Sequence, residues 1–227
     1  MRVGLVFRAN ASPPGCWQAR LATPPDWREI RYPSLPGFSL CGMRKDPVMN
    51  VCMAQINTLV GDIAGNTQRV LEVSAAQKVA GAHMVVFPEL TLTGYPPEDL
   101  LLRGDLLDRS EAALARLCAE LPPDLAIVVG YPRGQDGVLF NSAGVISAGQ
   151  LLAQYDKQCL PNYEVFDEKR YFAAGTEPCI VDIDGLSVGL TICEDIWHPE
   201  PAAQAKVAGA EILININASP FHRGKTS

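Results

Sequence analysis

The sequence predicts an α/β fold in which helices cover layered, mixed β-sheets. Two segments carry this prediction, "KVAGAHMVVFPEL" at 78–90 and "KVAGAEILININA" at 206–218, which share an identical helix end before an apolar run. In both, the helix closes at a glycine, which is typical just after a helix C-terminus, and the chain returns directly into a buried strand. Runs typical of β-hairpins lie between the two segments, and this alternation indicates an α/β sandwich of mixed sheets.

The regular elements begin near Met49. Val70, Val73 and Ala76 recur at helical spacing and predict one amphipathic helix, and the Asp-Gly step of "DIDG" predicts a hairpin turn. In chain order we expect a strand at 50–56, a helix at 65–80, a strand at 84–89, a helix at 105–120, strands at 125–132, 139–147 and 150–157, a polar loop at 158–178, a hairpin over 179–193, a helix at 200–208 and a strand at 211–218.

Residues 1–48 differ in composition from the rest of the chain. They hold seven of the 18 prolines and show neither a helical nor a strand period, which predicts an irregular extension. The segment carries seven Lys/Arg against three Asp/Glu, whereas residues 49–227 carry 12 against 22. We therefore expect a Pro/Arg-rich extension at 1–48, followed by a single acidic domain at 49–227.

Composition excludes several classes of protein. The longest apolar runs have the length of a strand, well short of the roughly 18 to 20 residues of a membrane-spanning helix, so no membrane partner is expected. An acidic domain without a basic stripe is a poor candidate for binding nucleic acid. Seven irregularly spaced cysteines without a CxxC pair argue against a disulfide framework or a metal site, and favour the reducing cytoplasm.

Glu89 and Lys157 end apolar runs and are candidates for a functional site. A carboxylate partly stripped of water, as at the end of "MVVFPE", is a better general base near neutral pH than an exposed one. A lysine after "LLAQYD" could supply fixed positive charge, both to favour a nearby thiolate and to stabilise an oxyanion. The simpler alternative for each is a solvated charge at a strand end.

Cys193 in "GLTICEDIWHP" leaves an apolar run directly before two acids, which disfavour a thiolate. A lone cysteine is more often a small buried hydrophobe than a nucleophile. At the end of a strand, however, its sulfur would be exposed, and the N–H of Glu194 would be placed to bind an oxyanion. A reactive Cys193 would then need the cation that Lys157 could provide.

These residues carry a resemblance. The segments "FPEL", "YDKQCLPNYEVFDEKRYF" and "ICEDIW", in the order Glu, Lys, Cys, resemble the carbon–nitrogen hydrolase (nitrilase) superfamily. Three segments, "TGYPPEDLLLR", "LPNYEVFDEKRYF" and "NASPFHRGK", are similar to the glutaminase domains of glutamine-dependent NAD synthetases. The resemblance covers the chain from about Met49 onward and implies an α-β-β-α sandwich of two mixed sheets. Because such a fold normally continues past the "NASPF" strand, we expect it to be truncated and incomplete at the C-terminus.

The resemblance also implies roles for individual residues. Glu89 would be the general base, Lys157 the cation that stabilises the tetrahedral intermediate, and Cys193 the nucleophile that forms a thioester with the side chain of glutamine. The candidate contacts to the substrate are Tyr95, Tyr163, Glu194 and Ser219. For Tyr95 the alternative is packing beside its prolines. For Glu168 the alternatives are a solvated loop residue or a carboxylate that holds Lys157 in place.

The partners and cofactors follow from the same resemblance. Glutamine would be the substrate, and the ammonia would pass to a synthetase domain, in cis in a longer chain or in trans, which uses ATP to amidate nicotinic acid adenine dinucleotide to NAD. The glutaminase step itself needs no cofactor and no metal. The segment "SPFHRGKTS" does not form a P-loop, because Ser219 stands where a glycine is needed. The superfamily also implies assembly into homo-oligomers.

Two other interpretations stay open on the sequence alone. One is a stand-alone amidase of the same superfamily that acts on another small amide, which glutamine specificity would distinguish. The other is a non-catalytic remnant whose only activity is association with other subunits, which unfolding and titration of Cys193 would distinguish.

Overall fold

The computed structural model describes residues 16–20, 49–163 and 166–218. Its strands and helices are, in chain order, β1 (Cys16–Arg20), β2 (Asn50–Ala54), α1 (Ile63–Val79), β3 (Met84–Val86), the 3₁₀ helix η2 (Glu98–Leu102), α2 (Gly104–Glu120), β4 (Ala126–Gln135), β5 (Val138–Ser147), β6 (Gln150–Asp156), η3 (Glu168–Arg170), β7 (Ile180–Ile183), β8 (Leu186–Ile192), η4 (Cys193–Trp197), α3 (Pro199–Val207) and β9 (Ile212–Ile216).

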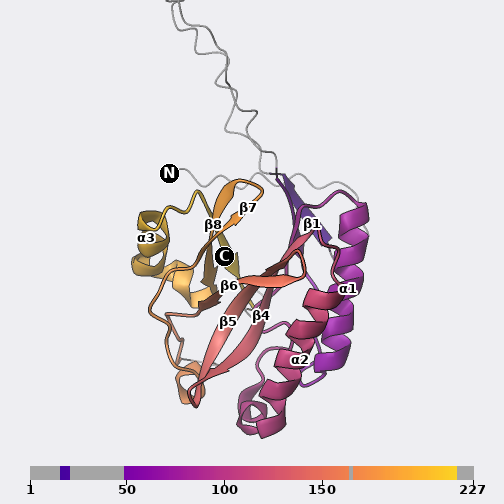
Figure 1. Cartoon of the computed structure of the whole chain (residues 1–227). Coiled ribbons are helices and arrows are strands. Elements are labelled where there is room, and N and C mark those ends of the chain that lie inside the picture. The colour runs from indigo at the N-terminus through magenta and orange to yellow at the C-terminus, as the bar shows by residue number, and fades with distance from the viewer. Residues whose placement is uncertain (1–15, 21–48, 164–165, 219–227) are drawn as a thin grey trace, which may run out of the picture.

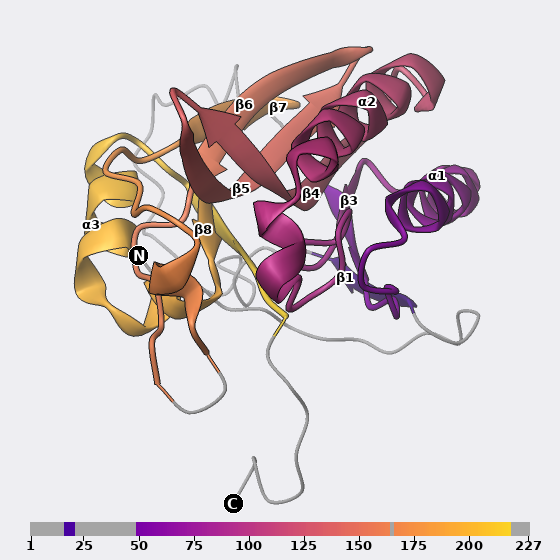
Figure 2. The same cartoon turned by 90° about the horizontal axis from the view of Figure 1, so that it is seen from below.

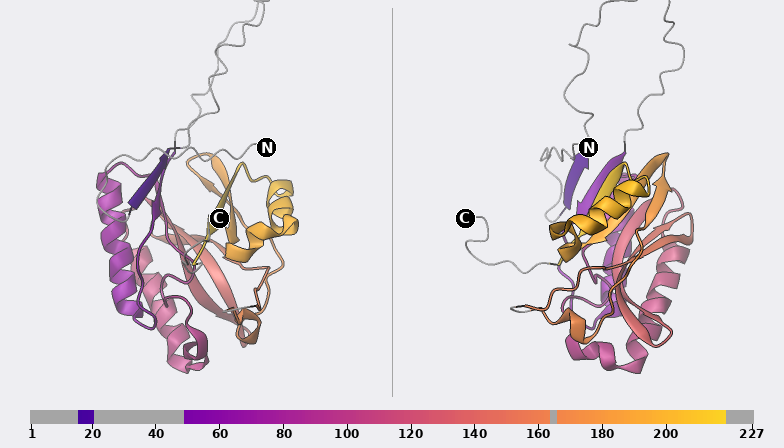
Figure 3. Two further views of the ribbon diagram at one scale, coloured as in Figure 1. Left: turned by 180° about the vertical axis from the view of Figure 1, so that it is seen from behind. Right: turned by 90° about the vertical axis from the view of Figure 1, so that its left-hand side faces the viewer.

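These elements stack in four layers, helix on sheet on sheet on helix (Figure 1). Helices α1 and α2 lie side by side on the outer face of the larger sheet, and α3 lies on the opposite side of the molecule, against the smaller sheet (Figure 2). The view from behind shows the same order (Figure 3). Within the described ranges, no helix has the length and apolar character needed to cross a membrane.

Both sheets are mixed, as the sequence predicts. The larger sheet has the order β1-β2-β3-β4-β5-β6, in which β3 pairs in parallel with β2 and β4 while the other pairs are antiparallel. The smaller sheet has the order β7-β8-β9, with β7 and β8 antiparallel and β8 and β9 parallel. The parallel pairs β2/β3 and β8/β9 are each joined by a crossover helix, α1 and α3, as parallel strands require.

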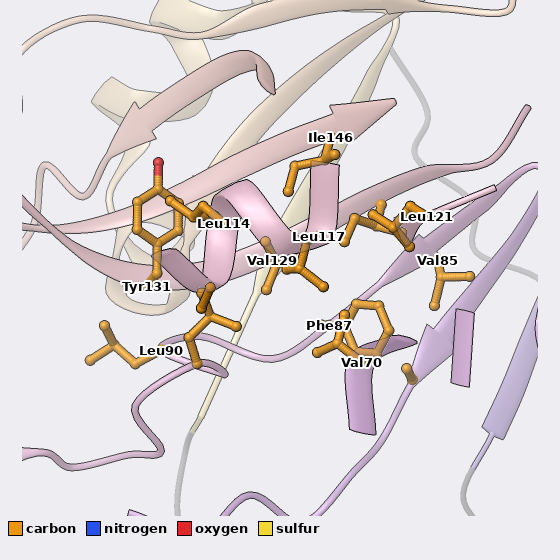
Figure 4. Close-up of a cluster of buried hydrophobic side chains, with 14 of the residues drawn as sticks. Val70, Val85, Phe87, Leu90, Leu114, Leu117, Leu121, Val129, Tyr131 and Ile146 are labelled. Atoms are coloured by element: carbon orange, nitrogen blue, oxygen red, sulfur yellow. The ribbon is translucent and has the colours of Figure 1, made fainter. Parts of the chain in front are cut away.

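The larger sheet is buried on both faces, so alternate residues of its strands enter two separate cores. On β4, Ile127 and Val129 pack toward the helices, whereas Ala126 and Val128 pack toward the smaller sheet. Figure 4 shows part of the core beneath the helices. Its labelled members are Val70, Val85, Phe87, Leu90, Leu114, Leu117, Leu121, Val129, Tyr131 and Ile146. Both faces of the central strands are therefore fixed by packing.

The repeated segments at 78–90 and 206–218 form equivalent structures. α1 and α3 each end just before a glycine with positive φ, +87° at Gly81 and +100° at Gly209, which a residue with a Cβ would adopt only at a cost. The N–H groups of Gly81 and Ala82 donate to carbonyls in the last turn of α1, and Gly209 and Ala210 do the same in α3. This is the Schellman pattern of capping, and it turns each helix directly into β3 or β9.

Two local features differ from the sequence predictions. Residues 16–20 form β1, which pairs with β2, although the sequence predicts an irregular segment over 1–48. In "CWQAR" the residues from Trp17 to Arg20 alternate apolar and polar, but this run is too short to predict a strand, and pairing with the edge of β2 is what makes it one. Strand β3 ends at Val86 rather than at 89, because Pro88 has no N–H with which to continue the sheet.

Candidate active site

The residues proposed from the sequence gather where strands end. Glu89 follows β3, Lys157 directly follows β6, and Cys193 directly follows β8. The repeated segments meet at this place, since the Glu89 N–H donates to the Asn217 carbonyl at 3.4 Å. Carboxyl ends of strands are where open α/β sheets collect functional groups.

Glu89 is held by three donors from three different segments. Its Oε1 accepts hydrogen bonds from Nζ of Lys157 and from Nδ2 of Asn141, both at 2.8 Å. Its Oε2 accepts a bond from the main-chain N–H of Ala218 at 3.1 Å. The side chain is fully buried, so these bonds replace the water that the carboxylate loses on folding.

Lys157 is the cation at the centre of this cluster. Its side chain is 0% exposed, and Nζ lies 2.8 Å from Oε1 of Glu89 and 2.8 Å from both carboxylate oxygens of Glu168. Burial by itself would lower the pKa of Lys157, but attraction to Glu89, Glu168 and Cys193 outweighs it and raises the pKa above its ordinary value. Lys157 therefore stays charged, and its positive charge interacts with Cys193.

Glu168 holds Lys157 in place, the second of the two alternatives that the sequence leaves open. It lies in η3 within the 158–178 loop and is buried rather than solvated. Burial raises the pKa of Glu168, opposed by Lys157 and reinforced by the charge of Glu89. Tyr95 donates its hydroxyl proton to Oε1 of Glu168 at 3.1 Å, and burial together with the Glu168 charge raises the pKa of Tyr95. Tyr95 thus stays protonated and donates a hydrogen bond to this cluster.

Cys193 has a strained backbone. Ile192 is still extended, with φ −127° and ψ 119°, but Cys193 has φ +45°, in the left-handed region that residues with a Cβ rarely occupy. The chain turns sharply there from β8 into the single turn of η4. A strained turn of this kind between a strand and a helix is the device that presents a nucleophile at the end of a sheet.

Asp195 joins the turn at Cys193 to the segment after Lys157. Its Oδ2 accepts bonds from the Ile192 N–H at 2.9 Å and from the Tyr155 hydroxyl at 2.8 Å. Its Oδ1 accepts bonds from the N–H groups of Gln158 at 3.1 Å and Cys159 at 2.7 Å. One fully buried carboxylate therefore fixes the ends of β6 and β8 relative to each other.

The candidate substrate contacts form one wall. Tyr163 donates its hydroxyl proton to Oε2 of Glu194 at 2.9 Å, and its ring packs against Phe166, which packs in turn against Tyr95. Tyr163 is 51% exposed, so the wall faces solvent. Ser219 lies outside the described residues.

Tyr95 and Glu168 also line a pocket of about 230 Å³. Its remaining lining comes mainly from η2 and the segment around η3, and includes neither Lys157 nor Cys193. These two candidate catalytic residues therefore lie outside the pocket. Within the described ranges, no three His, Cys, Asp or Glu side chains are grouped so that they could hold a metal ion.

Gly130 allows β4 to pass directly beneath Glu89. A Cβ at this position would lie 2.3 Å from the Leu90 nitrogen and 2.8 Å from Cα of Glu89, distances that backbone atoms cannot tolerate. We expect Gly130→Ala to lower the free energy of unfolding by about 1–3 kcal/mol and to reduce activity by displacing Glu89. Chemical denaturation measures the first effect.

The matched control is Gly104→Ala, because a Cβ at Gly104, in the first turn of α2, meets nothing within 4 Å. This variant should unfold at the same denaturant concentration as the parent or slightly above it. If Gly130→Ala were equally harmless, β4 would not pass this close to Glu89 in the folded protein.

The fold and the site define a class of protein. The family model described as carbon-nitrogen hydrolase matches residues 50–227, and the chain belongs to this family. A glutamine-dependent NAD(+) synthetase of Xanthomonas campestris pv. campestris is 46% identical over 180 residues, which cover 78% of this chain and 32% of that protein. One from Aquifex aeolicus is 42% identical over 182 residues, 79% of this chain and 32% of that protein. The chain thus spans about a third of the length of these curated relatives.

Solved structures support the same fold. The glutamine-dependent NAD+ synthetase of Acinetobacter baumannii, in complex with ADP, superimposes with a TM-score of 0.74 at 39% identity, over 77% of this chain and 33% of that chain. An amidase from Nesterenkonia sp. superimposes with a TM-score of 0.70 over 78% of this chain and 68% of that one. At 24% identity, the amidase shows the fold alone. The predicted nitrilase-type sandwich of two mixed sheets is confirmed.

Sequence reasoning missed two residues of the site. Asn141 and Asp195 each contact a segment that carries a candidate catalytic residue, yet neither was singled out. A signal for Asn141 was present, since the polar pair Asn141-Ser142 interrupts an otherwise apolar strand. Three of the partners of Asp195, namely Tyr155, Gln158 and Cys159, lie more than 30 residues away in sequence, and only the folded structure brings them together.

Proposed function

We propose that this chain hydrolyses the side-chain amide of glutamine through a thioester on Cys193. The observation that carries the proposal is the buried ion cluster of Glu89, Lys157 and Glu168 beside a cysteine in a strained turn. A buried cation that pairs with two carboxylates next to a thiol is costly to maintain for structure alone, and is typical of a site with tuned acid–base groups. The names of the curated relatives support glutamine as the substrate.

The first half-reaction would form the thioester. Glu89 takes the proton of the Cys193 thiol, and the sulfur attacks the amide carbon. The positive charge of Lys157 and the N–H of Glu194 stabilise the oxyanion of the tetrahedral intermediate. Glu89 then returns its proton to the nitrogen as the carbon–nitrogen bond breaks, and ammonia leaves.

The second half-reaction would release glutamate. Glu89 takes a proton from water, whose oxygen attacks the thioester carbon, and the proton passes to the departing sulfur of Cys193. Tyr163 and Glu194, which already contact each other, would bind the amino-acid head of glutamine together with Ser219. The ammonia would serve an ATP-dependent synthetase domain, in cis or in trans, in the cytoplasm.

Ammonia release from a panel of amides tests this proposal. We expect kcat/KM for glutamine to exceed that for butyramide by at least about 100-fold, because a site built around polar contacts to the amino-acid head discriminates strongly against a substrate that lacks this head. A coupled glutamate dehydrogenase assay measures the released ammonia. Equal rates on short aliphatic amides would instead support the second candidate, a stand-alone amidase, which the shared fold of the Nesterenkonia amidase keeps open.

A further inference from the structure

Asn141 is a buried side chain of β5 that contacts Glu89. Its Nδ2 donates to Oε1 of Glu89 at 2.8 Å, and its main-chain carbonyl accepts the N–H of Lys157 at 2.9 Å. The residue is 0% exposed. One residue therefore contacts two of the three charged members of the buried cluster, Glu89 through its side chain and Lys157 through its backbone.

The amide of Asn141 has only one workable orientation. Its Oδ1 is buried and has no hydrogen-bond partner among the described residues. Exchanging nitrogen and oxygen would place Oδ1 against the Glu89 carboxylate, so that two acceptors would face each other and the Nδ2 donor would be lost. A buried acceptor without a partner costs stability. An asparagine at this position is therefore poorly suited to packing and well suited to donating a hydrogen bond to Glu89.

The donors to Glu89 are distributed unequally between its two oxygens. Oε1 accepts from both Lys157 and Asn141, which uses both of its lone pairs. Among the described residues, Oε2 accepts only the bond from the Ala218 N–H, at 3.1 Å, which leaves it one lone pair. A proton can therefore bind to Oε2 of Glu89, whereas no lone pair of Oε1 is available to it.

We propose that Asn141 is a positioning residue that, together with Lys157, occupies Oε1 of Glu89 and so assigns proton transfer to Oε2. This inference rests on the proposed role of Glu89 as the base for Cys193. Without Asn141, Oε1 regains a free lone pair, the carboxylate can turn about its terminal bond, and the proton is shared between two positions. Asn141 thereby acts on the reaction through Glu89 and does not touch the substrate.

Asn141→Leu tests the inference, because leucine has nearly the same shape and removes both the donor and the unpartnered oxygen. We expect kcat for ammonia release to fall about 10- to 100-fold, as for loss of one hydrogen bond to a charged group, with KM for glutamine within about threefold of the parent. The melting temperature should stay the same or rise. Ser74→Ala in α1 is the control, since it also removes a buried oxygen that has no hydrogen-bond partner in the part of the chain that the structure describes, but in the outer helix layer.

A second measurement needs no substrate. The rate of alkylation of Cys193 by iodoacetamide, followed by peptide mass spectrometry against pH, reports proton transfer from the thiol to Glu89. In Asn141→Leu, with Lys157 and Glu168 unchanged, alkylation should be about 10-fold slower than in the parent, so that the whole profile shifts to lower rates, because Glu89 loses the donor that holds its carboxylate in one orientation. Ser74→Ala should reproduce the profile of the parent.

The two measurements separate failure of this inference from failure of the proposed function. A parent that releases no ammonia from glutamine, with a shifted alkylation profile in Asn141→Leu, would overturn the function and support the role of Asn141. An Asn141→Leu protein with the kcat and alkylation profile of an active parent would overturn the inference. The inference would also be overturned if Asn141→Leu lost activity only in proportion to the loss of folded protein, because Asn141 would then have a structural role alone.

Discussion

Replacing Lys157 with methionine is expected to lower the free energy of unfolding by about 3–5 kcal/mol, the typical cost of removing one partner from a buried ion pair. Lys157 is the cation that neutralises Glu89 and Glu168, and all three side chains are buried. Methionine fills a similar volume but leaves two carboxylates facing each other without the cation. The variant should also lose ammonia release, because the proposed oxyanion loses its positive charge.

The defect in Lys157→Met should depend on pH in a defined direction. Burial already raises the pKa of Glu168 above its usual value of 4.5, and loss of Lys157 removes the interaction that opposes this rise. An acid with a raised pKa in the folded state binds its proton more tightly there than in the unfolded chain. The folded variant is therefore favoured at low pH, and stability is lost as pH rises through the raised pKa. The destabilisation relative to the parent should be smaller at pH 5 than at pH 8.

Urea denaturation at the two pH values measures both effects. Lys206→Met is the control, since Lys206 lies on the exposed surface of α3, and its loss should change stability by less than about 0.5 kcal/mol. If Lys157→Met were as stable as this control at pH 8, the buried ion cluster would not exist in solution.

Replacing Cys193 with alanine is expected to reduce ammonia release by at least about 10⁴-fold, the scale found when a catalytic nucleophile is removed. The side chain is small and 6% exposed, and alanine fits the same space, so folding should be retained. Cys193→Gly should be equally inactive but more stable than the parent by about 1 kcal/mol, because glycine adopts a φ of +45° without strain.

Cys179→Ala is the matched control for the thiol. Cys179 is a partly buried cysteine on another segment, and burial together with the charge of Asp156 raises its pKa to about 11. It lies before β7, and its replacement should leave ammonia release unchanged. Intact-mass detection of a glutamyl adduct on the parent, absent from Cys193→Ala, would support the thioester. Activity that survives in a folded Cys193→Ala protein would show that another group is the nucleophile.

The sequence by itself determined the local structure and the residues to examine. The glycine at the end of each repeated segment fixed where α1 and α3 stop, because only a glycine reaches their φ values without strain. The Asp-Gly step fixed the turn between β7 and β8, and continuous apolar runs marked the central strands β3 and β4. The three residues proposed for catalysis stood at strand ends, where a polar side chain directly after an apolar run makes the residue a candidate for a functional site.

The tertiary structure alone decided how those residues interact. Whether Glu168 was a solvated loop residue or the partner of Lys157 depended on how the 158–178 loop folds back, and its local composition suits both. Asn141 and Asp195 acquired their contacts through strand pairing and through segments far apart in the chain. Strand β1 formed because β2 offered an edge. The physical reason is common to all of these cases: local propensity fixes backbone conformation, whereas burial and the pairing of buried charges depend on residues distant in sequence.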